Sequence, residues 1–74
     1  MPTEHEIALA IQQRPSWAAF LAMDENDNWY YYQDRPKTQH AFWESAQRMC
    51  FFHYLHGSDR HWKSTLIEVG HGME

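Results

Sequence analysis

The chain lacks disulfide cross-links and any segment that would place it in a membrane. Cys50 is the single cysteine among 74 residues, so no disulfide can form within the chain, and a lone thiol is typical of a reducing compartment. No apolar stretch approaches the roughly 20 residues of a membrane span, and the start Met-Pro-Thr-Glu lacks a signal peptide's basic residues. We therefore expect a cytoplasmic protein that binds no membrane, with Cys50 as a small buried apolar side chain.

The chain also lacks an excess of positive charge. Six Lys and Arg against ten Asp and Glu give a formal net charge of −4, with histidine neutral. This balance argues against nonspecific binding to nucleic acid or to an anionic membrane, since both need a basic surface. Nucleic-acid binding is a weaker alternative, which would require four basic residues to cluster: Lys37, Arg48, Arg60 and Lys63.

Catalytic and nucleotide-binding motifs are missing as well. There is no glycine-rich phosphate loop and no Gly-x-Ser-x-Gly elbow. A chain this short rarely forms a deep pocket of about 300 Å³ or more. We therefore predict that the protein is not an enzyme and needs no cofactor.

Scattered histidines give only a weak metal pattern. Cys50, His53 and His56 are three residues apart, and His61 follows five residues later. Cys50 and His53 would point to opposite faces of a strand, and steps of three spread ligands widely around a helix. We predict no bound metal; a small His-dependent nuclease or metal-binding factor using these histidines is the alternative function.

Aromatic residues are abundant, at 16% of the chain, and they define a β-hairpin. Two apolar and aromatic runs, 17–23 and 29–33, flank five Asp, Glu and Asn residues that favour a turn. A third aromatic run over 49–55 has strand length, and we expect it to join the same sheet. A single helix over 40–56, ended by Gly57, is the competing prediction.

Helix signals stand at both ends of the chain. Thr3 and Glu6 have the spacing of a capping box, and Pro15 ends a helix over 3–14. Residues 62–69 are expected to form a short second helix. Its cap would be Ser58 or Asp59, its terminator Gly70, and its buried face Trp62, Leu66 and Val69.

Together these elements predict one α+β domain over residues 1–74. An N-terminal helix packs on a three-stranded antiparallel sheet, and a short C-terminal helix closes the fold. The expected buried side chains are Trp17, Phe20, Trp29, Phe51, Trp62 and Leu66.

The order of motifs over residues 17–69 resembles a group of small phage and prophage proteins. These share a D-x-x-G-x-W-Y-x-Y … K-P hairpin and a closing D-W-K-D-S-L segment. The matching residues here are Asp24, Trp29, Tyr30, Tyr32, Arg35, Pro36, Trp62, Lys63 and Leu66. Asp27 stands where the group has glycine, and Ser64-Thr65 replaces Asp-Ser. The resemblance implies an accessory protein of a phage or mobile element that acts in the bacterial cytoplasm.

Such a protein is expected to bind and inhibit a host or defence protein through an aromatic and acidic surface. We expect three aromatic anchors, Tyr30, Tyr32 and Trp43, because Trp and Tyr dominate interface energetics. We expect three acidic residues, Asp24, Glu25 and Asp27, to steer a basic partner. An exposed aromatic sheet edge would also allow a homodimer.

Overall fold

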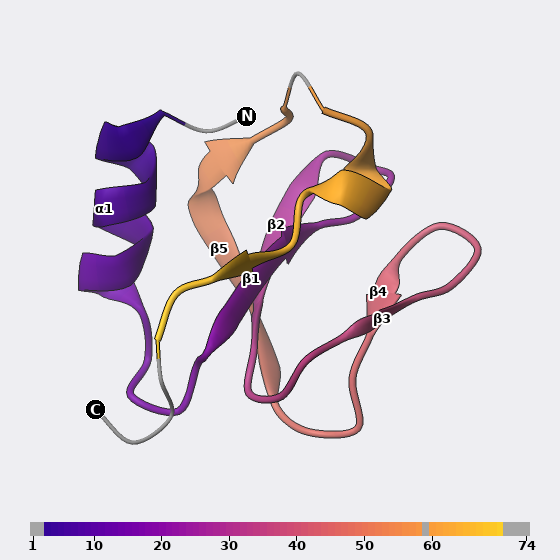
Figure 1. Cartoon of the computed structure of the whole chain (residues 1–74), viewed down its shortest axis with the longest axis horizontal. Coiled ribbons are helices and arrows are strands. Elements are labelled where there is room, and N and C mark those ends of the chain that lie inside the picture. Colours follow the sequence, from indigo (N-terminus) through magenta and orange to yellow (C-terminus); the bar gives the residue numbers. More distant parts are fainter. Residues whose placement is uncertain (1–2, 59, 71–74) are drawn as a thin grey trace.

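The computed structural model describes residues 3–58 and 60–70 (Figure 1). Helix α1 spans Glu4–Gln13. Strands follow at β1 (Phe20–Met23), β2 (Asn28–Tyr32), β3 (Lys37–Thr38), β4 (Trp43–Glu44) and β5 (Met49–His56). A 3-10 turn, η1 (Trp62–Ser64), and a final strand, β6 (Ile67–Glu68), complete the fold, which is α+β as predicted.

The N-terminal helix forms as its capping box predicts. The amide of Glu6 donates to Oγ1 of Thr3 at 3.1 Å, and the amide of Thr3 donates to Oε1 of Glu6 at 2.9 Å. At the other end, the hydroxyl of Tyr31 donates to the carbonyl of Ala10 at 2.6 Å. Ala10 belongs to the last turn, where carbonyls have no partner within the helix. Tyr31 therefore fastens α1 to one face of the sheet.

The main sheet has four strands in the order β5-β2-β1-β6, all antiparallel, rather than the predicted three. The predicted hairpin is present as β1 and β2, with Leu21 opposite Tyr31. The predicted third strand is β5, with Cys50 opposite Tyr31. The competing prediction of one helix over 40–56 is therefore wrong.

The predicted C-terminal helix over 62–69 is also wrong. Only the single turn η1 forms, and Ile67 then pairs with Leu21 as part of the fourth strand. β-branched residues alternate at Thr65, Ile67 and Val69, a pattern that favours a strand. His61 caps η1 in place of the predicted residues: Ser58 Oγ accepts from the amide of Arg60, and Asp59 lies outside the described residues.

The region between Pro36 and Met49 folds as a second, two-stranded sheet of β3 and β4. Lys37 lies opposite Glu44, and Thr38 lies opposite Trp43. The hydroxyl of Tyr32 donates to the carbonyl of Trp43 at 3.3 Å. The small hairpin therefore covers part of the sheet face that carries Tyr32, opposite the face that α1 covers.

The core forms between these layers, and four of the six side chains predicted to be buried are more exposed than expected. Trp29 and Trp62 are buried as predicted, while Trp17, Phe20 and Leu66 are only partly buried against the core. Phe51 is half exposed, and its neighbour Phe52 is the buried residue. Phe52 lies opposite Trp29 and shares its face, so the strand register buries Phe52 and turns Phe51 outwards.

Candidate functional site

Three of the six predicted contact residues lie in the interior. The amide of Trp43 donates to Oδ1 of Asp24 at 2.9 Å, and its indole Nε1 donates to the carbonyl of Met23 at 3.0 Å. Tyr32 is fully buried beside them. Asp24, Tyr32 and Trp43 therefore hold the β3–β4 hairpin against the main sheet and present little surface to a partner.

Burial governs the ionisation of these groups. Desolvation raises the pKa of the Asp24 carboxyl, and the hydrogen bond from the Trp43 amide partly opposes that shift. Desolvation also raises the pKa of Tyr32, and the nearby charge of Asp24 adds to the effect. Every buried side-chain nitrogen or oxygen in the described ranges has a hydrogen-bond partner. The buried polar side chains of the described residues are therefore satisfied within the fold.

The other three predicted contact residues remain accessible. Glu25 and Asp27 are exposed in the turn between β1 and β2. Asp27 adopts a φ of 72°, a left-handed conformation that glycine adopts readily and Asp tolerates. Tyr30 is half-buried, and its ring lies 5.6 Å from that of Phe51. An acidic turn and one predicted anchor therefore face solvent.

Strand β5 carries exposed apolar side chains at the border of the sheet; the sequence predicted an exposed aromatic edge, but not that it would lie on β5. β5 is an outer strand of the main sheet, and three of its large side chains are strongly exposed. The exposed fractions are 44% for Met49, 51% for Phe51 and 56% for Tyr54. Met49 and Phe51 project from the same face as Tyr30, whereas the ring of Tyr54 lies 5.6 Å from that of Phe52 on the opposite face. We call these three residues, with the backbone of β5, the β5 edge. The aromatic richness of 49–55 was visible in the sequence, but not its position at the border of the sheet.

The hydrogen-bond pattern shows which backbone groups of β5 point away from the sheet. The amide of Gln33 donates to the carbonyl of Arg48 at 3.0 Å, so these two residues form a hydrogen-bonded pair. Such pairs alternate along an antiparallel ladder, so Cys50 bonds β2 and its neighbours do not. Met49 and Phe51 therefore direct their amides and carbonyls toward the open side of the strand.

An irregularity in β5 bends its far end toward the acidic turn. Trp29 lies opposite Phe52, whereas its neighbour Asn28 lies opposite His56, so β5 carries extra residues there. The amide of Gly57 then donates to the carbonyl of Asp27 at 2.9 Å. The end of the β5 edge and the acidic turn are thus adjacent.

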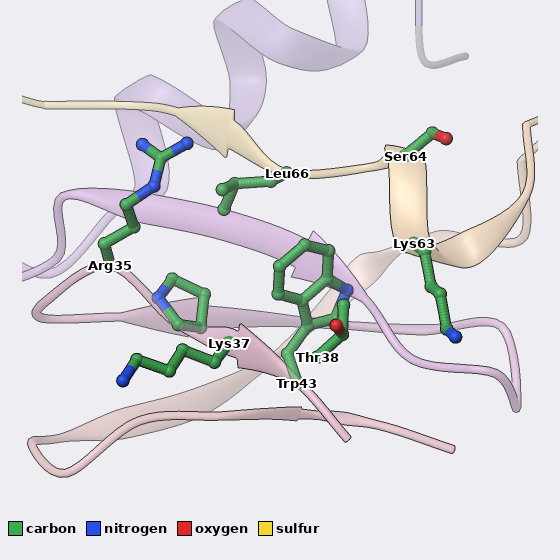
Figure 2. Close-up of a pocket in the computed structure, with 8 residues that line it drawn as sticks. Arg35, Lys37, Thr38, Trp43, Lys63, Ser64 and Leu66 are labelled. Atoms are coloured by element: carbon green, nitrogen blue, oxygen red, sulfur yellow. The ribbon is translucent and has the colours of Figure 1, made fainter. Parts of the chain in front are cut away.

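A second surface feature is an open groove of about 530 Å³ between the β3–β4 hairpin and the segment of η1 and β6 (Figure 2). We call it the basic groove because three cationic side chains line it and no carboxylate does. The Arg35 guanidinium lies 5.8 Å from the centre of the Phe20 ring, and the Lys63 ammonium lies 5.5 Å from that of Trp62. The lining residues are Arg35, Pro36, Lys37, Thr38, Trp43, Lys63, Ser64 and Leu66.

The groove unites only part of the predicted basic cluster. Lys37 and Lys63 both line it, although they are far apart in the sequence. Arg48 instead lies over the ring of Trp17, at 5.8 Å, and Arg60 is not among the groove residues. Arg35 takes their place. It was part of the family resemblance, but its contribution to a basic surface was not foreseen.

The predicted candidates Cys50, His53, His56 and His61 do not come together as a metal site in the described residues. Within residues 3–58 and 60–70, no three His, Cys, Asp or Glu side chains come together as a possible metal-ligand group. Cys50 is half-buried, and desolvation raises its pKa, which favours the neutral thiol. The described residues therefore offer no assembled metal centre and no activated cysteine.

Comparison of the chain with protein-family models, with curated proteins and with solved structures gives no match. In the part of the chain that the structure describes, no helix combines the length and the apolar character needed to cross a bilayer.

Proposed function

We propose that this chain is an accessory protein of a phage or mobile element that binds and inhibits a host or defence protein. We propose a binding role and not an enzymatic one, in the cytoplasm of the bacterial host. The observation that carries the binding role is the β5 edge: an eight-residue outer strand with open backbone groups and three exposed apolar side chains. The motifs of the hairpin and of the segment 62–66 support the phage origin.

The occupant that fits this edge best is an extended segment of the partner. An added strand would pair with the backbone groups of Met49 and Phe51, which is the common mode of recognition at a sheet edge. Its apolar side chains would lie against Phe51 and Tyr30, whose rings already stack obliquely at 5.6 Å. Of the aromatic anchors expected from the sequence, Tyr30 keeps its role, and Phe51 replaces the buried Tyr32 and Trp43.

The acidic turn between β1 and β2 favours one orientation of the partner's extended segment along β5. Glu25 and Asp27 are exposed next to the end of β5, so a basic residue at one end of the partner's segment would meet them there. Opposite charges at the rim of an interface act mainly on the rate of association. The double variant Glu25→Gln, Asp27→Asn should slow association with the partner and weaken its dependence on salt. Asn is chosen because it also tolerates the left-handed φ of Asp27.

Phe51→Ser tests the side-chain contact, with Phe42→Ser as a matched control. Phe42 is exposed to a similar degree, at 45%, but lies in the β3–β4 hairpin and not on β5. Wild type and both variants would be used to capture proteins from bacterial lysate. A captured partner is then purified and titrated calorimetrically. We expect Phe51→Ser to weaken binding by about 2 kcal/mol or more, as at an interface hot spot, and Phe42→Ser to have little effect.

Met49→Pro tests the backbone contact independently. The amide of Met49 points away from β2, and proline is tolerated at the first residue of an outer strand. The variant should therefore keep its melting temperature and lose affinity for the partner. Retention of full affinity by both Phe51→Ser and Met49→Pro would show that the β5 edge is not the docking surface.

Self-association is the competing use of the same edge. Sedimentation velocity at micromolar concentration distinguishes the two. A dimer that Phe51→Ser dissociates would show that a second copy of the chain covers the β5 edge, and it would contradict the proposed strand addition by a foreign partner.

A further inference from the structure

The basic groove is unusual for a chain with this charge. The protein carries a formal net charge of −4 and only six Lys and Arg residues, yet three of the six line this one groove. No Asp or Glu lines it with them. Like charges in one place repel each other and raise the local positive potential, which attracts anions. The groove therefore carries a local excess of positive charge within an acidic protein, and on their other side Arg35 and Lys37 line a neighbouring hollow with Asp34 and Glu44.

The arrangement of the cations divides the groove into two ends. Arg35 and Lys37 lie on one side of Trp43, and Lys63 and Ser64 lie on the other (Figure 2). Leu66 and the edge of Trp43 form a less polar middle between them. A ligand complementary to this layout has an anionic group at each end and a less polar body in between.

Two of the cations are supported by aromatic rings. Arg35 lies over Phe20 and Lys63 lies over Trp62, at centroid distances of 5.8 and 5.5 Å. A cation held over a ring loses less side-chain freedom when it binds a ligand, because part of its order is already present. The guanidinium of Arg35 can donate two parallel hydrogen bonds to a phosphate, and the hydroxyl of Thr38 is a further donor.

We propose that the basic groove binds a small molecule that carries two phosphate groups separated by a less polar body. Arg35 holds one phosphate and Lys63 holds the other, while the head groups of Lys37 and Ser64 point in other directions and add polar character at the two ends (Figure 2). A long nucleic acid fits less well, because Arg48 and Arg60 do not extend the groove and the chain has a formal net charge of −4. This site is separate from the β5 edge and does not depend on the proposed function.

A matched ligand series tests the two-ended site. Adenosine 3′,5′-bisphosphate, AMP and adenosine share a body and carry two, one and no phosphates. Calorimetric titration of the full chain should show affinity falling about tenfold or more with each phosphate removed, since each charge-assisted contact is strong. Equal affinity for all three, or no binding of the bisphosphate, would overturn the proposal.

Charge-neutral variants assign the two ends. Arg35→Gln and Lys63→Gln should each weaken bisphosphate binding about tenfold, and Lys63→Gln should abolish the preference for the bisphosphate over AMP. Arg60→Gln is the matched control, since it removes the same charge outside the groove. These side chains are exposed, and unchanged thermal melts would show that the variants are folded. An equal loss of affinity in the Arg60→Gln control would show that net charge, and not the groove, governs binding.

Titration with a single-stranded oligonucleotide tests whether the groove binds nucleic acid instead of a small bisphosphate. An oligothymidylate of about 20 nucleotides should bind no more tightly than the bisphosphate, because only three cations meet it and the salt dependence is correspondingly shallow. Tighter binding by the oligonucleotide, with a salt dependence reporting more than three contacts, would replace the proposed small ligand with nucleic acid.

Discussion

Replacing Thr65 by valine should lower the free energy of unfolding, because the lost hydroxyl holds two hydrogen bonds to buried backbone groups. Thr65 is almost completely buried, and its hydroxyl accepts a hydrogen bond from the amide of Met23 at 2.9 Å. It also lies 2.7 Å from the carbonyl of Trp62, to which it donates. These contacts join the end of η1 to strand β1.

The strand topology explains why Met23 needs this side chain. β6 pairs only with Phe20 and Leu21, so it ends before it reaches Met23. The outward amide of Met23 is therefore bonded by Thr65, and its carbonyl is bonded by the indole of Trp43 at 3.0 Å. Two side chains complete the strand edge where the neighbouring strand is missing.

Thr65→Val has nearly the same shape but leaves the buried Met23 amide without a partner. An unsatisfied buried donor costs about 1–3 kcal/mol. In a domain of this size, 1 kcal/mol corresponds to about 4–8 °C in melting temperature. We expect a loss of about 2 kcal/mol in the free energy of unfolding, and a fall of roughly 8–16 °C in the melting temperature.

Urea unfolding followed by circular dichroism measures this loss, and Thr65→Ser is the control. Serine keeps the hydroxyl and removes one methyl group, which costs about 1 kcal/mol. The slope of the free energy against urea should be unchanged, because the same surface is exposed. A valine variant as stable as the wild type, with the serine variant destabilised, would refute the reasoning and show that packing of the methyl group, not the hydroxyl, matters at this position.

Three further changes have defined outcomes. Because burial raises the pKa of Asp24 in the folded state, its contribution to stability is full below its usual pKa of 3.8 and is lost as pH rises through the raised value. Asp24→Asn, which can still accept from Trp43, should therefore gain stability relative to wild type as the pH rises above 3.8, as followed by thermal melts. Burial likewise raises the pKa of Tyr31 to about 12, so the stability that it supplies is full below pH 10 and is lost as pH approaches 12. Tyr31→Phe should cost about 1 kcal/mol at neutral pH, through the lost bond to Ala10, and should flatten this alkaline loss in urea titrations. Gly57 has a φ of 77° with no atom within 4 Å of an added Cβ, so Gly57→Ala should cost about 1 kcal/mol from backbone strain alone, and Gly57→Asn measurably less. Equal melting temperatures of the two Gly57 variants would contradict the strain argument.

Local signals in the sequence were sufficient for the elements that depend on neighbouring residues. The capping box of Thr3 and Glu6 and the stop at Pro15 fix α1, because the groups that satisfy the helix ends are only three or so residues away. The run of turn residues from Asp24 to Asn28 fixes the first hairpin for the same reason.

The C-terminal segment shows where local signals fail. Residues 62–69 fit a helix by spacing, but Ile67 and Glu68 become a strand because β1 offers unpaired backbone groups more than 40 residues earlier in the chain. A long-range pairing of that kind gives only a weak signal in the sequence, here the alternation of the β-branched residues Thr65, Ile67 and Val69.

The tertiary structure likewise decides which aromatic side chains face solvent. The sequence determined that the chain has more aromatic surface than a small core needs, and that its turn is acidic. It could not place Trp43 and Tyr32 inside and Phe51 outside, because that choice depends on the register of β5 against β2 and on the hairpin that covers one face. The basic groove has the same origin: Arg35, Lys37 and Lys63 meet because β6 brings the C-terminal segment back beside β1, and no spacing in the sequence encodes that return.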